Sequence, residues 1–233
     1  MLSRFFPTFL LMTALAGCNT MGVRSTDQSG PQPDPQLTSS SEARFFSKSG
    51  LQACAGGALV GLATCKLTNT CDSDQGMVTA ALVGCGVGMG ANYYLDQRRA
   101  EYANEEQRLD VMIADVQKDN QKLQTLTATA TEVLNQNRQQ LSTLQTQLAQ
   151  QQIQREQAEK QLAQVDANTD YLRNSLANLE QRERDWRQVA QAEQQSQKQQ
   201  ELNDEINRMQ KQIISLRDNV NEVEQQRDAI VLG

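Results

Sequence analysis

The stretch from residue 109 to residue 130, LDVMIADVQKDNQKLQTLTATA, decides the fold class. Its apolar residues follow one another in alternating steps of three and four, which is the spacing of one buried stripe on an α-helix. Asp119 occupies one position of the same stripe. The apolar members are Leu109, Met112, Val116, Leu123, Leu126 and Ala130. The pattern predicts a helix that packs one face against other helices.

The helical pattern extends far beyond this stretch. Residues 91–232 contain neither glycine nor proline, the two strongest helix breakers. After a four-residue step to Leu134, the stripe continues through Leu141, Leu144, Leu148, Leu162, Val165, Leu172, Leu176, Leu179 and Trp186. A polar stretch, 192–200, then precedes a last stripe of Leu202, Ile206, Met209, Ile213, Leu216, Val220, Val223 and Ile230. We therefore predict an all-α protein with a long coiled-coil helix over residues 96–233.

Two arrangements of this region fit the pattern. A continuous helix over residues 91–232 would be about 210 Å long at 1.5 Å per residue and would pair with other copies of the chain. Alternatively, the chain folds back near residues 166–170 or within 192–200 and forms an antiparallel hairpin. Because neither stretch contains glycine or proline, we favour the continuous helix and a homo-oligomer. Asn137, Gln151, Arg155 and Thr169 stand at core positions and weaken the middle of the stripe.

The first seventeen residues have the layout of a signal peptide: Arg4, then an apolar run over residues 5–14, then a short cleavage region. The cleavage region, Leu15-Ala16-Gly17-Cys18, resembles the lipobox of bacterial lipoproteins. This resemblance implies cleavage before Cys18, acylation of its thiol and its amine, and a firm membrane anchor. Asn19 stands where aspartate retains many such proteins in the inner membrane, so the resemblance implies an outer-membrane lipoprotein facing the periplasm.

Residues 18–44 are predicted to form a lipidated, disordered tether. They hold Pro31, Pro33 and Pro35, several serines and threonines, and few large apolar side chains. Such a composition buries too little surface to offset the entropy lost on ordering. The three alternating prolines are expected to keep the chain extended and stiff.

Residues 45–95 are predicted to form a glycine-rich helical hairpin. Two small-residue apolar segments, 51–67 and 77–95, flank a polar turn at 68–76. Gly57 and Gly61, and likewise Gly84 and Gly88, are four residues apart, which lets helix backbones pack closely. Each segment is near the lower length limit for crossing a bilayer. The sequence leaves open whether the hairpin enters the membrane or packs beside it.

Four cysteines fall in this hairpin, and we expect them to form two disulfides in the oxidising periplasm. Facing residues of an antiparallel hairpin have nearly constant index sums, and the pairs Cys54–Cys85 and Cys65–Cys71 satisfy this condition. The other two pairings would force one helix out of register. The spacings lack the Cys-x-x-Cys pairs that are typical of zinc sites, so no metal is expected.

The hairpin resembles the glycine-zipper hairpins of bacterial envelope lipoproteins. Tyr93-Tyr94-Leu95-Asp96-Gln97 is similar to the hairpin exit in the OmpA-family members of this group. In this chain, however, the coiled coil stands where those relatives carry a globular cell-wall-binding domain. The resemblance therefore implies the hairpin but not cell-wall binding.

Composition excludes several function classes. The chain has no histidine, which removes the commonest general base and metal ligand. Its net charge of −6 disfavours nucleic acid as a partner. We expect no enzyme activity, cofactor or small-molecule substrate. The remaining hypothesis is a scaffold or adaptor for other envelope proteins, such as an accessory component of a secretion system. The alternatives are a membrane-active oligomer assembled through the glycine hairpins and a cell-wall-associated structural lipoprotein.

One dense charged run surrounds the only tryptophan, Trp186. We expect Trp186, which stands at a core position, to pack in the interior. The neighbouring charges are expected to form a solvated helix face with pairs four residues apart, and a docking patch is the sharper alternative. The run consists of Arg182, Glu183, Arg184, Asp185 and Arg187.

Overall fold

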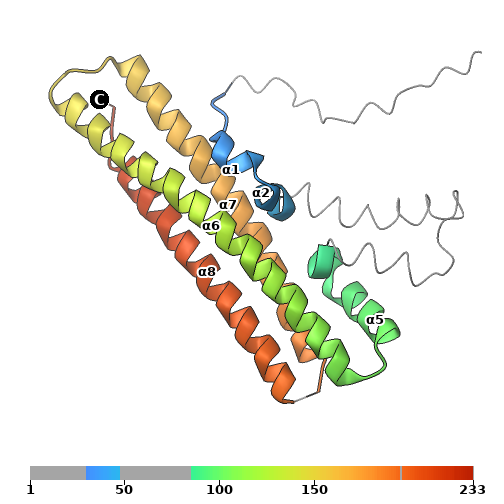
Figure 1. Ribbon diagram of the computed structural model, residues 1–233. Helices are drawn as coiled ribbons and strands as arrows, with labels where there is room; N and C mark the ends of the chain where they lie inside the picture. Colours follow the sequence, from blue (N-terminus) through green and yellow to red (C-terminus); the bar gives the residue numbers. More distant parts are fainter. Residues whose placement is uncertain (1–29, 48–84, 195, 233) are drawn as a thin grey trace, which may run out of the picture. The chain divides into compact units, whose positions relative to one another are not determined.

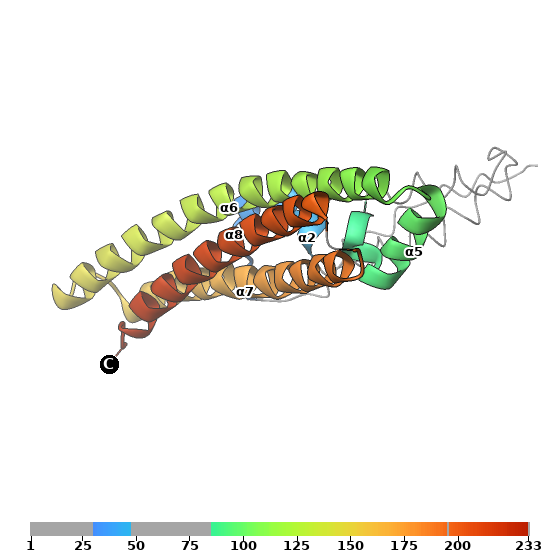
Figure 2. The same ribbon diagram turned by 90° about the horizontal axis from the view of Figure 1, so that it is seen from below.

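A long antiparallel bundle of three helices dominates the computed structural model, which describes residues 30–47, 85–194 and 196–232. The three helices are α6 (Glu105–Ala149), α7 (Arg155–Gln191) and α8 (Gln197–Asp228). They lie side by side in Figure 1 and Figure 2, with α6 and α8 parallel to each other and α7 antiparallel to both. The all-α class is confirmed for the residues described.

The shorter elements lie against one side of this bundle. They are α1 (Pro35–Ser39), α2 (Ser41–Phe46), the 3₁₀ helix η1 (Gly86–Met89) and α5 (Ala91–Glu101). Helix α8 packs along both α6 and α7, whereas α6 and α7 touch each other far less. Both α1 and α2 contact α6, and α2, η1 and α5 contact α7. The short elements therefore complete the core on the side that faces away from α8.

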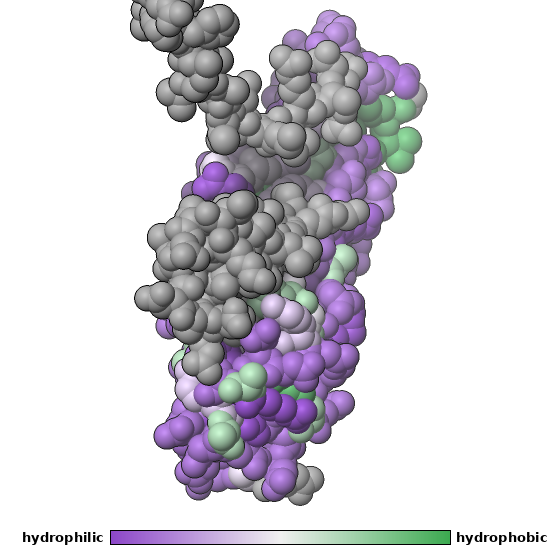
Figure 3. Space-filling view, turned by 90° about the vertical axis from the view of Figure 1, so that its right-hand side faces the viewer, coloured by the Kyte–Doolittle hydropathy of each residue, from purple (hydrophilic) through white to green (hydrophobic). Residues whose placement is uncertain are grey.

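The apolar stripes predicted from the sequence form the core of the bundle. All of their members except the half-buried Leu148 are buried, and most are fully inaccessible to solvent. Asp119, Asn137 and Thr169, which stand in the stripes, are buried as well. The coloured residues in Figure 3 are mostly hydrophilic, as expected when the apolar side chains point inward. The apolar stripes, which we expected to pack against other copies of the chain, are thus buried within one chain.

Between the start of α6 and the end of α8 the chain reverses direction twice, so the continuous helix that we favoured is not the arrangement found. The second reversal, between Gln191 and Gln197, falls within the polar stretch that was the alternative. The first reversal, between Ala149 and Arg155, was not predicted, and residues 166–170 are helical instead. Gln151 and Arg155, assigned to the core from the sequence, lie at this first reversal and are exposed.

The first reversal uses a Schellman motif without glycine. The Gln152 N–H donates to the carbonyl of Gln147 at 2.8 Å, and the Gln151 N–H donates to that of Leu148 at 3.1 Å. Gln151 has a φ of 54°, the left-handed conformation that glycine adopts most easily. Helix α6 therefore ends where the sequence shows no breaker.

A third interruption separates α5 from α6 at residues 102–104. Asn104 caps α6, since its side chain accepts the N–H of Gln107, and Glu105 and Glu106 occupy the first turn. Carboxylates there interact favourably with the positive end of the helix dipole. This cap is a sequence signal that the unbroken glycine-free run concealed.

The end of the predicted tether is ordered. Pro35 starts α1, whose cap is Asp34, and Ser40 caps α2 by accepting the N–H of Ala43 at 3.0 Å. Leu37, Ala43 and Phe46 are buried. The prediction of an extended, disordered chain is therefore wrong for residues 34–44. The earlier part of the tether, residues 18–29, lies outside the described residues.

Replacing Gln151 with glycine should stabilise the protein by about 0.5–1 kcal/mol. Glycine relieves the left-handed strain at this position, and part of that gain is offset by the greater freedom of the unfolded chain. Urea unfolding followed by circular dichroism measures the change. Gln150→Gly is the matched control: its φ of −90° needs no glycine, so it should leave stability unchanged or lower it. Equal effects from the two substitutions would contradict the assignment of strain.

Candidate functional site

A buried salt bridge joins α6 to α7 in the middle of the apolar core. The Arg182 guanidinium donates to both carboxylate oxygens of Asp119, from Nε at 2.6 Å and from Nη2 at 2.9 Å. Their side chains are 1% and 5% exposed. The Trp186 indole donates to the same carboxylate at 2.8 Å. Asp119 thus accepts three hydrogen bonds, which offset much of the penalty for burying its charge.

A second buried pair joins α5 to α6 one helical turn earlier. Arg98 Nη2 donates to Asp115 at 2.5 Å, and the Tyr94 hydroxyl donates to the same oxygen at 2.8 Å. The Tyr94 ring meets Trp186 edge to face, with centroids 5.2 Å apart. The two pairs therefore form one continuous group, which we call the charge network: Tyr94, Arg98, Asp115, Asp119, Arg182 and Trp186.

Burial changes the acid–base behaviour of the phenol in this network. It raises the pKa of Tyr94 above its ordinary value of 10.0, and the negative charge of Asp115 raises it further. The phenol therefore remains protonated and continues to donate its hydrogen bond at neutral pH. Within the network the carboxylates accept and the other groups donate, so the arrangement is built for positioning the three helices.

Glu193 extends the same connections to the turn between α7 and α8. Its carboxylate accepts from Arg108 Nη2 at 2.6 Å and lies 3.5 Å from Arg99 Nε. Arg99 also donates to the carbonyl of Ala192 at 2.7 Å. Side chains of α5 and α6 thereby order the turn between α7 and α8, whose own polar residues have little apolar surface to bury.

The N-terminal segment meets the charge network from the outside. We call residues 31–47, which contain α1 and α2, the strap. The Arg182 guanidinium carbon lies 4.5 Å from the centre of the Phe45 ring, and Lys122 Nζ lies 3.4 Å from the same centre. Both distances fall within the range of cation–π attraction. Burial lowers the pKa of Lys122 below its ordinary value, although the nearby Asp119 charge acts in the opposite direction.

Few of the predicted site residues fall where the structure can place them. Cys85 is disulfide-bonded, and its carbonyl accepts from Arg182 Nη2 at 2.9 Å. The pairing with Cys54 stays a prediction, because all the other members of the predicted site except Gly88 lie outside the described residues. These are Cys18, Cys54, Cys65, Cys71, Gly57, Gly61 and Gly84.

The glycine-rich arm differs from its predicted form in the part that is described. Gly88 belongs to the 3₁₀ helix η1, and Gly90, with a φ of 99°, separates η1 from α5. Residues 85–95 are therefore not one continuous helix with glycines along a packing face. Among the described residues, no helix has the length and apolar character needed to cross a membrane.

The charged run around Trp186 corresponds to neither sequence-based reading as a whole. Trp186 is fully buried, as predicted, and Glu183 pairs with Arg187 four residues away. Arg182, however, belongs to the core and binds Asp119. The sequence signal for this pair was an isolated carboxylate in an apolar stripe, since such a group needs a buried cation.

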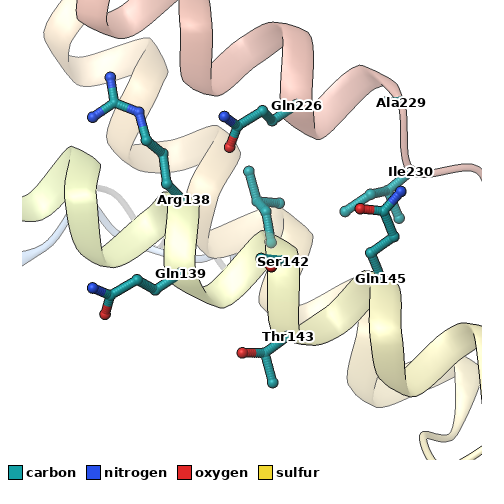
Figure 4. A pocket seen from close by; sticks show the side chains of 9 residues that line it. Arg138, Gln139, Ser142, Thr143, Gln145, Gln226, Ala229 and Ile230 are labelled. Carbon is teal, nitrogen blue, oxygen red and sulfur yellow. The ribbon is translucent and has the colours of Figure 1, made fainter.

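An open groove lies at the opposite end of the bundle. It has a volume of about 700 Å³ and runs between α6 and the end of α8. Arg138 on its rim is held by Glu222 at 2.7 Å and by Asn219 at 3.0 Å. Figure 4 shows mainly polar side chains around it, including Ser142, Gln145 and Gln226, with Ile230 on one side. Its one charged lining group is thus already paired.

Comparisons with known proteins identify no relative of this chain: no protein-family model, curated protein or solved structure matches it.

Replacing Asp119 with asparagine should destabilise the protein by about 3–5 kcal/mol. The substitution keeps the shape of the side chain but leaves the Arg182 charge buried without its counter-charge. Asp110→Asn is the control, because Asp110 pairs with Lys198 on the surface with its side chain 58% exposed. That change should alter the free energy of unfolding by less than about 1 kcal/mol. Urea unfolding measures both changes. Similar losses of unfolding free energy in the two variants would show that the buried pair contributes no more to stability than the surface pair.

Stability should also fall at alkaline pH. The pKa of Tyr94 in the folded state lies above its unfolded value of 10.0. Its contribution is therefore complete below pH 10 and is lost as pH rises toward the folded pKa. The Tyr94→Phe variant should lose less stability between about pH 9 and pH 11 than the parent protein does. Tyr93→Phe, at the exposed neighbour, should follow the parent profile, and parallel profiles for all three proteins would contradict the prediction.

Proposed function

We propose that this protein is a non-enzymatic lipoprotein of the bacterial envelope that holds a helical bundle near the outer membrane as an adaptor for other envelope proteins. The observation that carries the proposal is the sequence Leu15-Ala16-Gly17-Cys18 at the end of an apolar signal region. Acylated Cys18 would supply the anchor, and the bundle would face the periplasm. A secretion machine is one assembly with a use for such an adaptor.

The fold supports an adaptor that acts close to the membrane. Thirteen peptide bonds separate Cys18 from Pro31, the start of the strap, and they span at most about 45 Å when fully extended. Helix α6, the longest helix described, has 45 residues and is about 68 Å long at 1.5 Å per residue. A bundle of this length stays close to the anchor, whereas a continuous helix would extend about 210 Å from it.

The internal packing favours a docking role over a structural rod. Since the apolar stripes are buried within one chain, association with other copies is not needed to cover them. Two surfaces then remain for a partner to bind: the polar outer surface of the helices, and the strap. A rigid core held by buried ion pairs suits a module that presents such surfaces in a fixed geometry.

Metabolic labelling tests the anchor. When the full chain is expressed in a Gram-negative host with a clickable fatty acid, it should take up the label and fractionate with the outer membrane. Cys18→Ser should lose the label, because the thiol that would be acylated is absent. Asn19→Asp is the matched control, which should keep the label and move to the inner membrane. An unlabelled parent chain would refute the lipoprotein assignment.

Cross-linking in intact cells tests the adaptor role. The anchored chain should recover defined envelope proteins after membrane solubilisation, and the Cys18→Ser chain should lose them because it is no longer held at the membrane. Recovery of the chain without any partner from both strains would contradict an adaptor function while leaving the anchor intact.

A further inference from the structure

The strap lies between α6 and α7, and three of its backbone groups hydrogen-bond to side chains of α7. The Gln164 amide donates to the carbonyl of Gln32 at 2.7 Å, and Asn178 donates to that of Phe46 at 3.1 Å. The N–H of Asp34 donates to Asn168 at 2.7 Å. All three side chains belong to α7, and they contact the strap in the order of its sequence. Contacts of this kind recognise a peptide main chain and leave the choice of side chains open.

Two aromatic rings supply the side-chain recognition. Phe45 and Phe46 meet edge to face with centroids 4.9 Å apart, and Phe46 is buried. The guanidinium carbon of Arg182 lies 4.5 Å from one ring centre and 5.8 Å from the other. Lys122 Nζ also lies over the Phe45 ring, 3.4 Å from its centre. The groove therefore selects adjacent aromatic residues at the end of a helical turn.

The strap leaves hydrogen-bond donors in the groove without acceptors. Arg182 Nη1 and Asn137 Nδ2 are buried and have no hydrogen-bond partner among the described residues. The covering strap also keeps bulk water from them. Burying an unpaired donor is unfavourable, more so when it carries charge. The strap is therefore an imperfect occupant, and a ligand with an acceptor near Arg182 would fit the groove better.

Polar groups form part of the surface that the strap covers. Lys122 and Arg182 lie against the Phe45 ring, and Gln164, Asn168 and Asn178 hydrogen-bond to the backbone of the strap. Removing the strap would expose these polar groups together with the apolar surface that Leu37 and Phe46 cover. Contacts that combine polar and apolar groups in this way occur at interfaces between separable partners.

We propose that the α6–α7 groove is a peptide-binding site and that the strap is its displaceable resident occupant. The ligand is an acidic, aromatic segment of a partner protein: a carboxylate followed within one helical turn by two adjacent aromatic residues. The strap itself has this pattern in Glu42, Phe45 and Phe46. The assignment of a partner protein rests on the adaptor function proposed above; the groove and its occupancy do not.

Binding of a labelled strap peptide tests the site. The probe is a fluorescent peptide of residues 30–47, GPQPDPQLTSSSEARFFS, and the receptor is the full chain purified in detergent. Phe46→Ser weakens the chain's own strap, so this variant should bind the peptide at least tenfold more tightly than the parent. Circular dichroism establishes that its helices are intact. Equal affinities, or no binding to either chain, would overturn the proposal.

Matched variants separate the proposed site from adventitious binding. Within the Phe46→Ser chain, Asn178→Ala should weaken binding severalfold, because it removes the donor to the peptide carbonyl. Asn174→Ala should have no effect, since that exposed amide bonds to Asp170 of its own helix. Peptides with Glu42→Gln or with alanine at both aromatic positions should bind more weakly. Indifference to these changes would contradict the assigned chemistry.

Hydrogen exchange on the unmodified chain gives a test that depends on no variant. Strap amides should exchange at least tenfold faster than those in the middle of α8, because the strap opens without unfolding the bundle. Equal rates would show that the strap is part of a permanent core. Co-purification of two differently tagged copies, abolished by the peptide, would make a second copy the occupant and overturn the assignment to a partner. Because none of these measurements needs a membrane, their failure is distinguishable from failure of the lipid anchor.

Discussion

The pairing of Asp119 with Arg182 is the constraint on which the rest of the structure depends. An isolated charge in an apolar helical stripe is strongly unfavourable, whereas a bidentate pair with a third donor from Trp186 is acceptable. Only one register of α7 against α6 brings these groups together. The same register places Tyr94 on Trp186, so that α5 is fixed as well. Apolar side chains supply most of the favourable burial, while the charges determine which arrangement is reached.

Sequence periodicity identified which residues are buried but not what they are buried against. A stripe such as Leu109 to Ala130 satisfies a neighbouring copy and a later segment of the same chain equally well. The reversal at residues 150–154 determines that the stripe packs within one chain. There Gln151 adopts a left-handed conformation without being glycine. The gap in the stripe between Leu148 and Leu162 was the available signal, and it was read as a weak seam.

The candidate site was accessible from sequence only in part. Asp119 was recognised as a carboxylate at a core position, but Arg182 was grouped with the solvated charges around it, because the pairing joins residues far apart in the chain. Most of the strap was predicted to be disordered because residues 18–44 contain few large apolar side chains. These few apolar side chains, together with hydrogen bonds from α7 to the main chain, order the strap because α6 and α7 already form a groove for it. Composition measures what a segment can bury alone, not what a neighbouring surface provides.

The placement of Trp186 has a spectroscopic consequence. It is the only tryptophan in the chain, it is fully buried, and its indole bonds to the carboxylate at the centre of the charge network. Intrinsic fluorescence of this protein therefore reports on a single, defined location. A shift of the emission maximum to longer wavelength would register water reaching the contact between α6 and α7. Trp186 is thus an intrinsic fluorescent probe of the contact that contains the Asp119–Arg182 pair.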